Sequence, residues 1–477
     1  MKIENRKVII YFLLAVLLVI SFILRLWPIQ ISHWWDETVY LQHSEIIFSG
    51  INNYNEFNLR PPLLSIIFAA GYFIKHSVFT ASIIVSLLGT LGVFFTFMVG
   101  KELYNEEIGI LSSIFIGLSP FIVTASHWIM TDIPSLTFII ISFYLLLLAF
   151  KRDNNLLFLF SGIFFGISIL TRFTSLILTV IILIYAIIKK INFRKLIWIG
   201  CGLAIIITPY LIWAQIKYGF FMAVFINANM AVSDNNGGGL FYIKNILAVY
   251  PLVIIIGLLI YIIYQILSIK TCISEEFFRF IKKLGITYKN KFLYDEIILW
   301  LWIIIFLLYI SITSHKEIRY IIPIALPIYL LSAKGFYLLV KNVKVGFKVF
   351  VILLIVILSI VSFSGSFSKL NEPFINTYQT DAVKVSMYIK SLNIWNGTIY
   401  ANNDYPVYAY YTGMLVKKLQ SDDTNFYSDF PNNMPSHGFF IFDREIPKEP
   451  NYEWLQSNKK FKKIKEIGNL VIYEYLP

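Results

Sequence analysis

The sequence predicts a polytopic α-helical membrane protein of about 11 transmembrane helices, followed by a small extracytoplasmic α/β domain. Its mean hydropathy of +0.71, with 58% hydrophobic and 14% charged residues, excludes an ordinary soluble protein. Apolar runs of about 18 or more residues are typical of helices that cross a bilayer. Residues 367–477 are instead polar and rich in Tyr, Asn and Lys, which indicates a domain outside the membrane.

The apolar runs are each roughly 17–24 residues long, as a bilayer core requires. The first follows the basic N-terminal residues, is long for a signal-peptide core and lacks a small-residue cleavage site, so we expect an uncleaved first helix. The apolar segment Leu63–Ile74 is too short for a span and should lie along the membrane surface, in an outer loop of residues 28–76 with interfacial helices. The spans are predicted at 8–27, 77–100, 108–126, 134–150, 155–171, 174–188, 196–213, 246–269, 296–313, 320–338 and 348–366.

The distribution of Lys and Arg predicts which side of the membrane each loop faces. If the N-terminus is cytoplasmic, the even-numbered connections are cytoplasmic too, and together these segments hold most of the basic residues of the membrane region. That asymmetry satisfies the positive-inside rule. We therefore expect a multi-pass protein of the cell membrane with a cytoplasmic N-terminus. Its transmembrane domain would cover residues 1–366 and its extracytoplasmic domain residues 367–477.

The C-terminal residues have the pattern of a small α/β domain. Apolar side chains recur at helical spacing over Asp381–Leu392. Strand-like runs follow at Thr398–Ala401, Gly438–Phe442 and Leu470–Tyr475, separated by Asn, Pro and Gly.

The charge and the motif content exclude several classes of function. The net charge of +12 lies largely in short loops between spans, so the expected partners are membrane lipids and not nucleic acid. The six histidines show no zinc-binding spacing, and no phosphate-binding glycine loop is present, which argues against a nucleotide-driven pump.

The first outer loop contains two motifs that could carry chemistry. In Trp34-Trp35-Asp36-Glu37, the carboxylates follow two interfacial tryptophans, where a carboxylate could accept a proton from a hydroxyl substrate. A solvated loop with two ordinary acids is the alternative. In Arg60-Pro61-Pro62-Leu63, the prolines stiffen Arg60, and arginine is suited to bidentate phosphate binding. A snorkelling arginine is the alternative there.

Later outer loops add further charged residues on the same face. Asp132 precedes a proline at the start of a span, which also suits a helix N-cap. Arg172 lies at another outer turn. The run His315-Lys316-Glu317-Ile318-Arg319-Tyr320 could recruit an anion, although Glu317 could instead pair with Arg319 or Lys316.

In their order and sidedness these motifs resemble the polytopic C-type glycosyltransferases with the GT-C fold. The branch they resemble is that of the dolichyl-phosphate-mannose protein mannosyltransferases and aminoarabinose transferases, most clearly over residues 30–175. The resemblance implies that Asp36 is the catalytic aspartate, with Glu37 its acidic neighbour and Asp132 the acid of the second outer loop. It also implies that Arg60 contacts lipid phosphate. The run His315–Tyr320 resembles a basic segment before a late span in several branches.

The resemblance implies an extracytoplasmic transferase of a hexosyl or pentosyl group. A polyprenyl-phosphate sugar would be the donor, with its phosphate held by Arg60, Arg172 and the segment His315–Arg319. Asp36 would remove a proton from the acceptor hydroxyl, and a single displacement would invert the anomeric centre. Asp36 and Asp132 could share a divalent cation such as Mg²⁺ or Mn²⁺, and metal use is left open because oxygen ligands permit a metal without requiring one.

The acceptor is left open among protein, lipid and glycan. The C-terminal residues do not resemble the β-trefoil insertion of the eukaryotic protein mannosyltransferases, so their acceptor cannot be carried over. A transporter and a non-catalytic membrane scaffold are the alternatives to an enzyme. A transporter should place its polar residues near the bilayer midplane. A membrane scaffold would tolerate the loss of Asp36 and Arg60.

Overall fold

The computed structural model divides into two compact units. The first, here called the helical unit, comprises Met1–Ile29, Asn58–Leu64 and Ser82–Glu372. The second, here called the mixed unit, comprises Gln30–Phe57, Ser65–Ala81 and Pro373–Pro477. Within these units the structure describes residues 3–27, 33, 35–50, 60–188, 190–230, 238–268, 296–342, 348–350, 352–361, 364, 380–393, 397–401, 403–418, 438–445 and 452–475.

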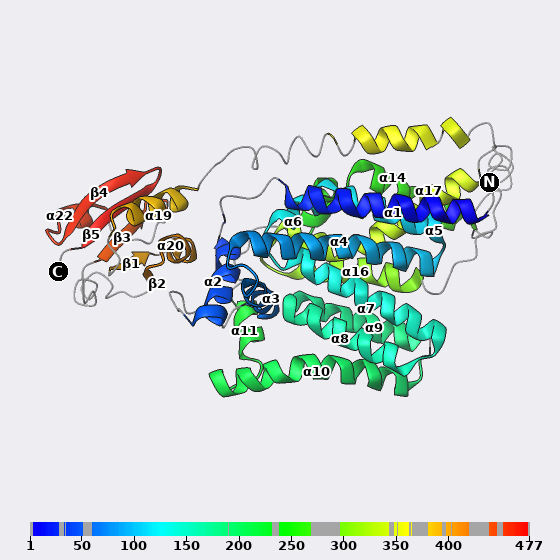
Figure 1. Ribbon diagram of the computed structural model, residues 1–477, viewed down its shortest axis with the longest axis horizontal. Helices are drawn as coiled ribbons and strands as arrows, with labels where there is room; N and C mark the ends of the chain where they lie inside the picture. The colour runs from blue at the N-terminus through cyan, green and yellow to red at the C-terminus, as the bar shows by residue number, and fades with distance from the viewer. Residues whose placement is uncertain are drawn as a thin grey trace. The chain divides into compact units, whose positions relative to one another are not determined.

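The helical unit consists of helices whose long members run alongside one another (Figure 1). They coincide closely with the apolar runs of the sequence. Their bounds are α1 Ile3–Leu26, α4 Val78–Leu103, α5 Glu106–Leu118, α6 Pro120–His127, α7 Asp132–Arg152, α8 Asn155–Thr171, η1 Phe173–Leu176, α9 Ile177–Ile188, α10 Phe193–Tyr218, α11 Ala223–Met230, α12 Phe241–Lys244, α13 Ile246–Val249, α14 Leu252–Ser268, α16 Glu296–Ile312, η2 Ile318–Ile324 and α17 Ala325–Asn342.

Five of the described helices are long and apolar enough to cross a membrane, and the bent pair α5 and α6 adds a sixth if it counts as one span. The other predicted spans coincide with shorter apolar helices of 10–17 residues, including one over Lys348–Val361. The protein is therefore a helical membrane protein with several apolar helices, and the number of 11 spans stays a prediction. The predicted third span is broken, because α5 and α6 meet at an angle of 54°.

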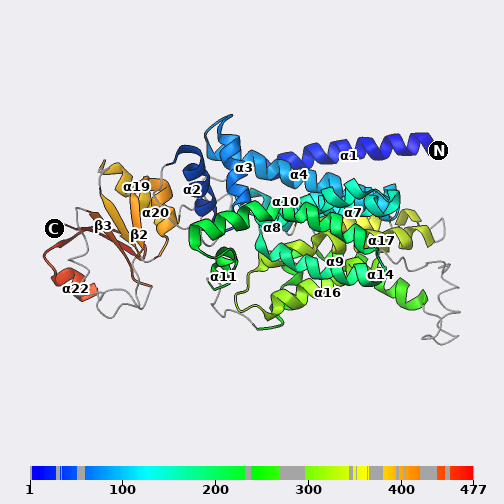
Figure 2. The ribbon, with the colours of Figure 1, turned by 90° about the horizontal axis from the view of Figure 1, so that it is seen from below.

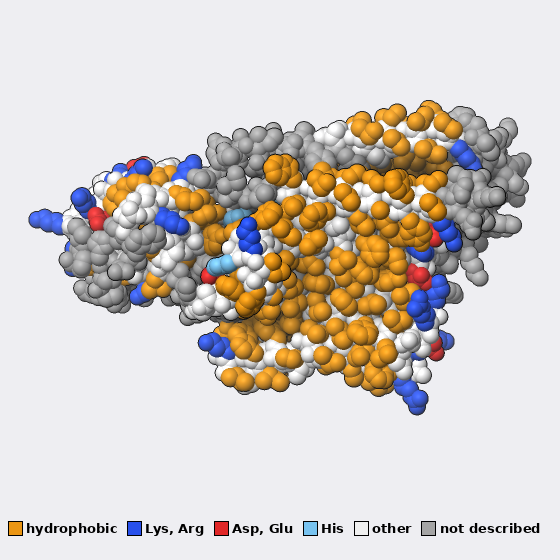
Figure 3. Space-filling view, viewed as in Figure 1, with side chains coloured by type: hydrophobic (Ala, Val, Ile, Leu, Met, Phe, Trp, Pro, Cys, Tyr) orange, Lys and Arg blue, Asp and Glu red, His pale blue; other side chains and the backbone are white. Residues whose placement is uncertain are grey.

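The surface of the helical unit is apolar over a broad area, as Figure 3 shows. Large hydrophobic side chains are exposed on well-separated helices, among them Phe12 of α1 (66%), Ile216 of α10 (81%) and Leu308 of α16 (59%). An exposed apolar surface of this extent is unfavourable in water and is the surface that lipid covers.

Small residues allow the helices to approach closely, as is common in membranes. Helices α8 and α10 lie side by side in Figures 1 and 2. Gly162 of α8 and Gly202 of α10 lie at their contact, where an added Cβ would collide with the carbonyl oxygens of Ile199 and Leu159 respectively. Gly200 on α10 has open space beside it, so the steric constraint is local to the contact.

The mixed unit contains a five-stranded sheet in the order β2-β1-β3-β5-β4. Strand β1 is parallel to β2 and β3, whereas β5 is antiparallel to β3 and β4. The helix and three strands predicted from the sequence are present. The elements are α2 Trp35–Ser49, α3 Leu63–Tyr72 (whose first two residues belong to the helical unit), α19 Asp381–Ser391, β1 Thr398–Ala401, α20 Tyr405–Thr412, β2 Leu415–Lys418, β3 Gly438–Asp443, α22 Tyr452–Ser457, β4 Phe461–Ile467 and β5 Leu470–Tyr475.

Helix α2, from the predicted outer loop, packs within the mixed unit against α20. The rings of Trp35 and Tyr405 meet edge to face with centroids 4.6 Å apart. Gln42 donates from Nε2 to the carbonyl of Pro406 at 2.5 Å, and Val39 is part of the same apolar core as the sheet. The outer loop therefore contributes a helix to the unit that contains the C-terminal residues. That arrangement differs from the predicted division at residue 366.

Candidate functional site

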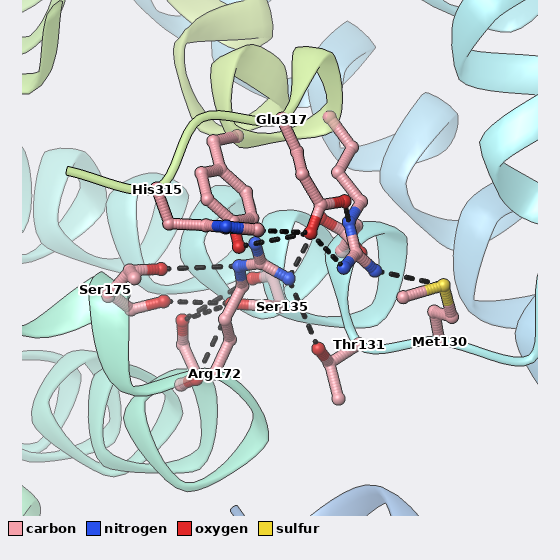
Figure 4. Close-up of polar contacts among 12 residues, drawn as sticks. Met130, Thr131, Ser135, Arg172, Ser175, His315 and Glu317 are labelled. Carbon is pink, nitrogen blue, oxygen red and sulfur yellow. Dashed lines mark hydrogen bonds and ion pairs between the residues drawn. The ribbon is translucent and has the colours of Figure 1, made fainter. Parts of the chain in front are cut away.

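Three loop–helix junctions of the helical unit bring charged side chains together (Figure 4). Asp132 is the first residue of α7, Arg172 is the C-cap of α8, and Glu317 is the N-cap of η2. Together with Arg319, these residues are called the outer charge cluster below. Helix ends expose backbone groups that favour charged partners, which suits such junctions for a polar site between apolar helices.

Asp132 is the buried anion of this cluster, with its side chain only 1% exposed. Arg172 Nη1 lies 2.8 Å from Asp132 Oδ1, and Arg319 Nη1 lies 3.9 Å from Oδ2. The N-cap position of α7 is held by Thr131, so the N-cap role considered for Asp132 is wrong. A carboxylate taken out of water requires such partners, and the two arginines lie at ion-pair distance from Asp132.

Glu317 connects the second arginine to a histidine and a tyrosine. Arg319 donates from Nη2 to Glu317 Oε1 at 2.8 Å and from Nε to Oε2. His315 Nε2 is 2.9 Å from Oε1, and the Tyr320 hydroxyl donates to Oε1 at 3.3 Å. Burial by itself would raise the pKa of Glu317, but the hydrogen bond and charge of Arg319, followed by those of His315, lower it to about 2. Glu317 is therefore ionised at neutral pH.

Arg172 has further contacts besides Asp132. It donates from Nε to the Thr174 hydroxyl at 3.2 Å and from Nη1 to the Thr131 hydroxyl at 3.4 Å. Its guanidinium lies over the Tyr320 ring, 5.2 Å from the centroid. These contacts position the planar group and leave it 12% exposed. That small exposed fraction is where an anion could reach it.

Lys316 lies beside the cluster but turns towards backbone. Its ammonium donates to the carbonyls of Ser311 and Thr313, at 2.9 and 2.6 Å, at the C-terminal end of α16. A cation there satisfies carbonyls that have no partner within the helix. These contacts suit helix capping, and its predicted role in substrate binding stays a prediction.

Arg60 belongs to the helical unit and is half-buried just before α3. Leu63, three residues later, packs with Phe173 against a hydrophobic cluster that includes Leu170. Leu170 and Phe173 flank Arg172 in sequence. The chain around Arg60 is thus anchored to the same helix end that carries Arg172.

Asp36 and Glu37 belong to the mixed unit, where both are buried in the first turn of α2. Glu37 Oε1 lies 3.7 Å from Nδ1 of the buried His33. The His33 backbone NH donates to the Tyr411 hydroxyl at 2.8 Å, which fixes the entry to the helix. Trp34 lies outside the described residues. The structure therefore brings the predicted residues together as two groups, one in each unit.

The predicted shared metal site joins residues of both units. Asp132 faces two guanidinium groups, a donor set that competes with a cation for the carboxylate. Over the described ranges, no group of three or more His, Cys, Asp or Glu side chains is arranged to hold a metal ion. A divalent cation at Asp36 and Asp132 stays a prediction.

Comparison with known proteins identifies the fold of the chain. Residues 59–213 match the family model described as Dolichyl-phosphate-mannose-protein mannosyltransferase. The structure is similar to that of ArnT from Cupriavidus metallidurans in the apo state, with a TM-score of 0.70 over 98% of each chain at 13% identity. ArnT bound to undecaprenyl phosphate matches with a TM-score of 0.68 at 12% identity, over 99% of this chain and 98% of that one.

The apo oligosaccharyltransferase of Archaeoglobus fulgidus also matches, with a TM-score of 0.62 at 12% identity over 91% of this chain and 70% of that one. The chain has the GT-C fold. The resemblance predicted from the sequence is thereby confirmed. No curated protein is detectably similar to the chain in sequence.

Two buried cations of the helical unit were not predicted from the sequence. Arg25, 1% exposed, donates to the carbonyls of Gly117 and Ile116 at 2.9 and 3.2 Å, where α5 ends before the bend. Lys334 pairs with the fully buried Glu296, which also accepts from the Tyr261 hydroxyl at 2.6 Å. Both cations lie inside the predicted spans 8–27 and 320–338, near their ends, and no sequence motif marks them.

A group of serine hydroxyls at the same helix ends was also not predicted from the sequence. The Ser135 hydroxyl lies 2.8 Å from that of Ser175 and 3.2 Å from that of Ser168, joining α7, η1 and α8. Isolated serines in apolar runs give no sequence signal for such a contact. They hold together the helix ends that carry Asp132 and Arg172.

Proposed function

We propose that the protein is a membrane glycosyltransferase that moves a hexosyl or pentosyl group from a polyprenyl-phosphate-linked donor to an acceptor hydroxyl. The observation that carries the proposal is the outer charge cluster, in which two nearly buried guanidinium groups share one buried carboxylate. The fold supports it, because the similar ArnT structure is bound to undecaprenyl phosphate.

The cluster has the chemistry to hold the phosphodiester of the donor and to stabilise the polyprenyl phosphate that leaves. Arginine presents a fork of donors that matches phosphate oxygens, and nearly buried donors are worth more than exposed ones. Asp132 and Glu317 orient the two guanidinium groups and neutralise part of their positive charge. A phosphate would therefore bind to arginines that are already paired with carboxylates. Arg60 and His315 would add donors at the same phosphate. Charge that develops on the phosphate as the bond breaks would then be stabilised by groups already in place.

Asp36 is the proposed general base. The acceptor oxygen attacks the anomeric carbon, the bond from that carbon to the phosphate oxygen breaks, and the proton of the hydroxyl passes to the Asp36 carboxylate. The polyprenyl phosphate leaves as an anion and the anomeric centre is inverted. Glu37 would orient the acceptor. Both carboxylates are buried in the first turn of α2, where the packed side chains around them hold their position, and this supports the assignment.

The topology that accompanies this function is also a proposal. The N-terminus would be cytoplasmic, and the C-terminal sheet would face the extracytoplasmic side, where acceptors such as proteins, lipids or glycans are found. The positive-inside distribution of Lys and Arg supports this orientation.

The test is sugar transfer by the full-length protein in nanodiscs. Polyprenyl-phosphate mannose or glucose with a labelled sugar is supplied together with an extract of host membranes as acceptor source. Transfer should fall by about 100-fold or more in Arg172→Ala and in Asp36→Asn. Lys217→Ala is the matched control, because Lys217 is a cation in the last turn of α10, outside the cluster, and it should transfer at the wild-type rate. Unchanged transfer in Arg172→Ala would refute the assigned site.

A further inference from the structure

The mixed unit contains a cavity that the proposed mechanism does not use. Its volume is about 450 Å³, within the range of roughly 300–1,000 Å³ that small-molecule sites occupy. Helices α2 and α20 and the end of α3 contribute its polar and aromatic lining, which includes Gln42, Glu45, Tyr72, His76 and Tyr410.

Gln42 beside the cavity has a buried amide oxygen without a hydrogen-bond partner in the described part of the chain. Gln42 is 6% exposed, and its Nε2 is committed to the carbonyl of Pro406. Its Oε1 accepts no hydrogen bond from any described group. A buried acceptor left in this state costs about 1–3 kcal/mol.

Further donors and acceptors surround the same cavity. Glu45 pairs with His76, and both side chains remain partly exposed. Burial first, and then the nearby Tyr72, Tyr411 and Glu45, raise the pKa of Tyr410, so its hydroxyl stays a donor at every physiological pH. The lining thus offers a carboxylate, an imidazole and a phenol, groups that can satisfy vicinal hydroxyls.

Aromatic rings gather beside this polar lining. The centroids of Tyr72 and His76 are 4.9 Å apart, and Phe48 lies 4.9 Å from His76 and 5.8 Å from Tyr72. Aromatic rings provide flat apolar surfaces with weakly negative faces. The C–H face of a pyranose ring packs well on such a surface while its hydroxyls turn to the polar groups.

The charge of the lining distinguishes between ligands. Glu45 is the ionisable acid among the described lining residues, and none of them is Lys or Arg. A phosphate would therefore meet a carboxylate and no strong cation, so this cavity does not suit the lipid-phosphate donor. An uncharged, hydroxyl-rich ring meets every requirement of the lining.

We propose that this cavity binds the pyranose ring of an uncharged glycan, and that this glycan is the acceptor. The second half of the proposal rests on the proposed function, whereas the binding itself does not. The proposal thus selects glycans as the acceptor class, in place of proteins or lipids. The cavity lies in the unit that also carries Asp36 and Glu37, nine and eight positions before Glu45 on the same helix.

Binding is tested with full-length protein in nanodiscs by saturation-transfer NMR, with methyl α-D-mannopyranoside and methyl α-D-glucopyranoside as probes and no donor present. We expect saturation transfer from the protein to the ring protons of at least one probe. Glu45→Gln and Tyr410→Phe should each weaken its Kd by about fivefold, the loss of one hydrogen bond. Mannose 6-phosphate should bind more weakly than either uncharged probe.

Two matched controls separate the cavity from the rest of the mixed unit. Glu466→Gln removes a carboxylate of β4 that pairs with Lys463 and with Arg444, and Tyr388→Phe removes a hydroxyl on α19. Both variants should bind the probes as the wild type does. Thermal unfolding of every variant verifies that the conservative substitutions leave the fold intact.

Three results would overturn the proposal. They are no binding of either glycoside, binding that Glu45→Gln and Tyr410→Phe leave unchanged, and preferential binding of an acetylated Ser/Thr peptide that depends on Glu45. Failure of the proposed function would look different. In that case the glycoside would bind with the expected dependence on Glu45, but no sugar would be transferred to it from any polyprenyl-phosphate donor.

Discussion

Arg172→Ala should destabilise the protein by an amount that the geometry of the cluster predicts. The guanidinium lies 2.8 Å from Asp132 Oδ1, and the two side chains are 12% and 1% exposed. Unit charges at that distance attract by about 6 kcal/mol at an effective dielectric constant near 20. Desolvation offsets much of this, and removing one partner of a buried pair typically costs about 3–5 kcal/mol.

The second arginine sets where in that range the value should lie. Arg319 Nη1 is 3.9 Å from Asp132 Oδ2 and remains in Arg172→Ala. It keeps Asp132 partly compensated, so the loss in the free energy of unfolding should be about 3 kcal/mol, the lower end of the range. In Arg172→Ala with Asp132→Asn, no unpaired carboxylate is left. The double variant should therefore recover about 2 kcal/mol relative to the sum of the single variants.

The free energies of unfolding are measured by SDS titration in mixed micelles, followed by tryptophan fluorescence. Lys217→Ala is the control for loss of a cation near a helix end and should match the wild type. If Arg172→Ala is as stable as the wild type, or if the two substitutions are strictly additive, the account of Asp132 as a buried anion held by Arg172 is refuted.

Three other predictions concern stability. The pKa of Glu317 is lowered from 4.5 to about 2, so its ionised form stabilises the folded protein fully above pH 4.5, and this stabilisation is lost as the pH falls through 2. Between these pH values Tm should drop more steeply in the wild type than in Glu317→Gln, and parallel curves of Tm against pH would contradict this. Gly162→Leu should sharply lower the yield of folded protein because its side chain would meet the α10 backbone, whereas Gly200→Leu should not; equal yields would be inconsistent with that packing. Lys334→Met should lower the free energy of unfolding by about 3 kcal/mol because it leaves Glu296 buried without a counter-ion. Adding Glu296→Gln should restore part of this free energy, and no recovery in the double variant would argue against the ion pair.

The sequence could predict the face on which the site lies but not its contacts. Asp132, Arg172 and Glu317 each follow or precede an apolar run, so counting spans from the N-terminus assigns them to one side. Their pairing depends on how α7, α8 and η2 pack, and no sequence periodicity encodes that packing. The sequence analysis left the partner of Glu317 open between Arg319 and Lys316. In the structure Arg319 donates to Glu317, whereas the ammonium of Lys316 donates to carbonyls at the end of α16.

The mixed unit illustrates a different reason for partial success. Strands β1, β3 and β5 occupy the middle of the sheet and are largely apolar, so their runs were recognised. Strands β2 and β4 are the edges and are rich in lysine, a common protection against edge-to-edge pairing that weakens the strand signal. The packing of α2 on α20 joins segments more than 350 positions apart, which the sequence alone could not indicate.

The most direct test of the central claim is the chemical identity of both products of the reaction. Purified protein in nanodiscs is given a polyprenyl-phosphate sugar of defined anomeric configuration together with a membrane extract. Released polyprenyl phosphate is quantified by mass spectrometry, and the new glycosidic bond is assigned by NMR. The account predicts one polyprenyl phosphate released per sugar transferred and an inverted anomeric centre, with both products lost in Asp36→Asn. A retained configuration, or sugar transfer that proceeds in Asp36→Asn, would contradict it.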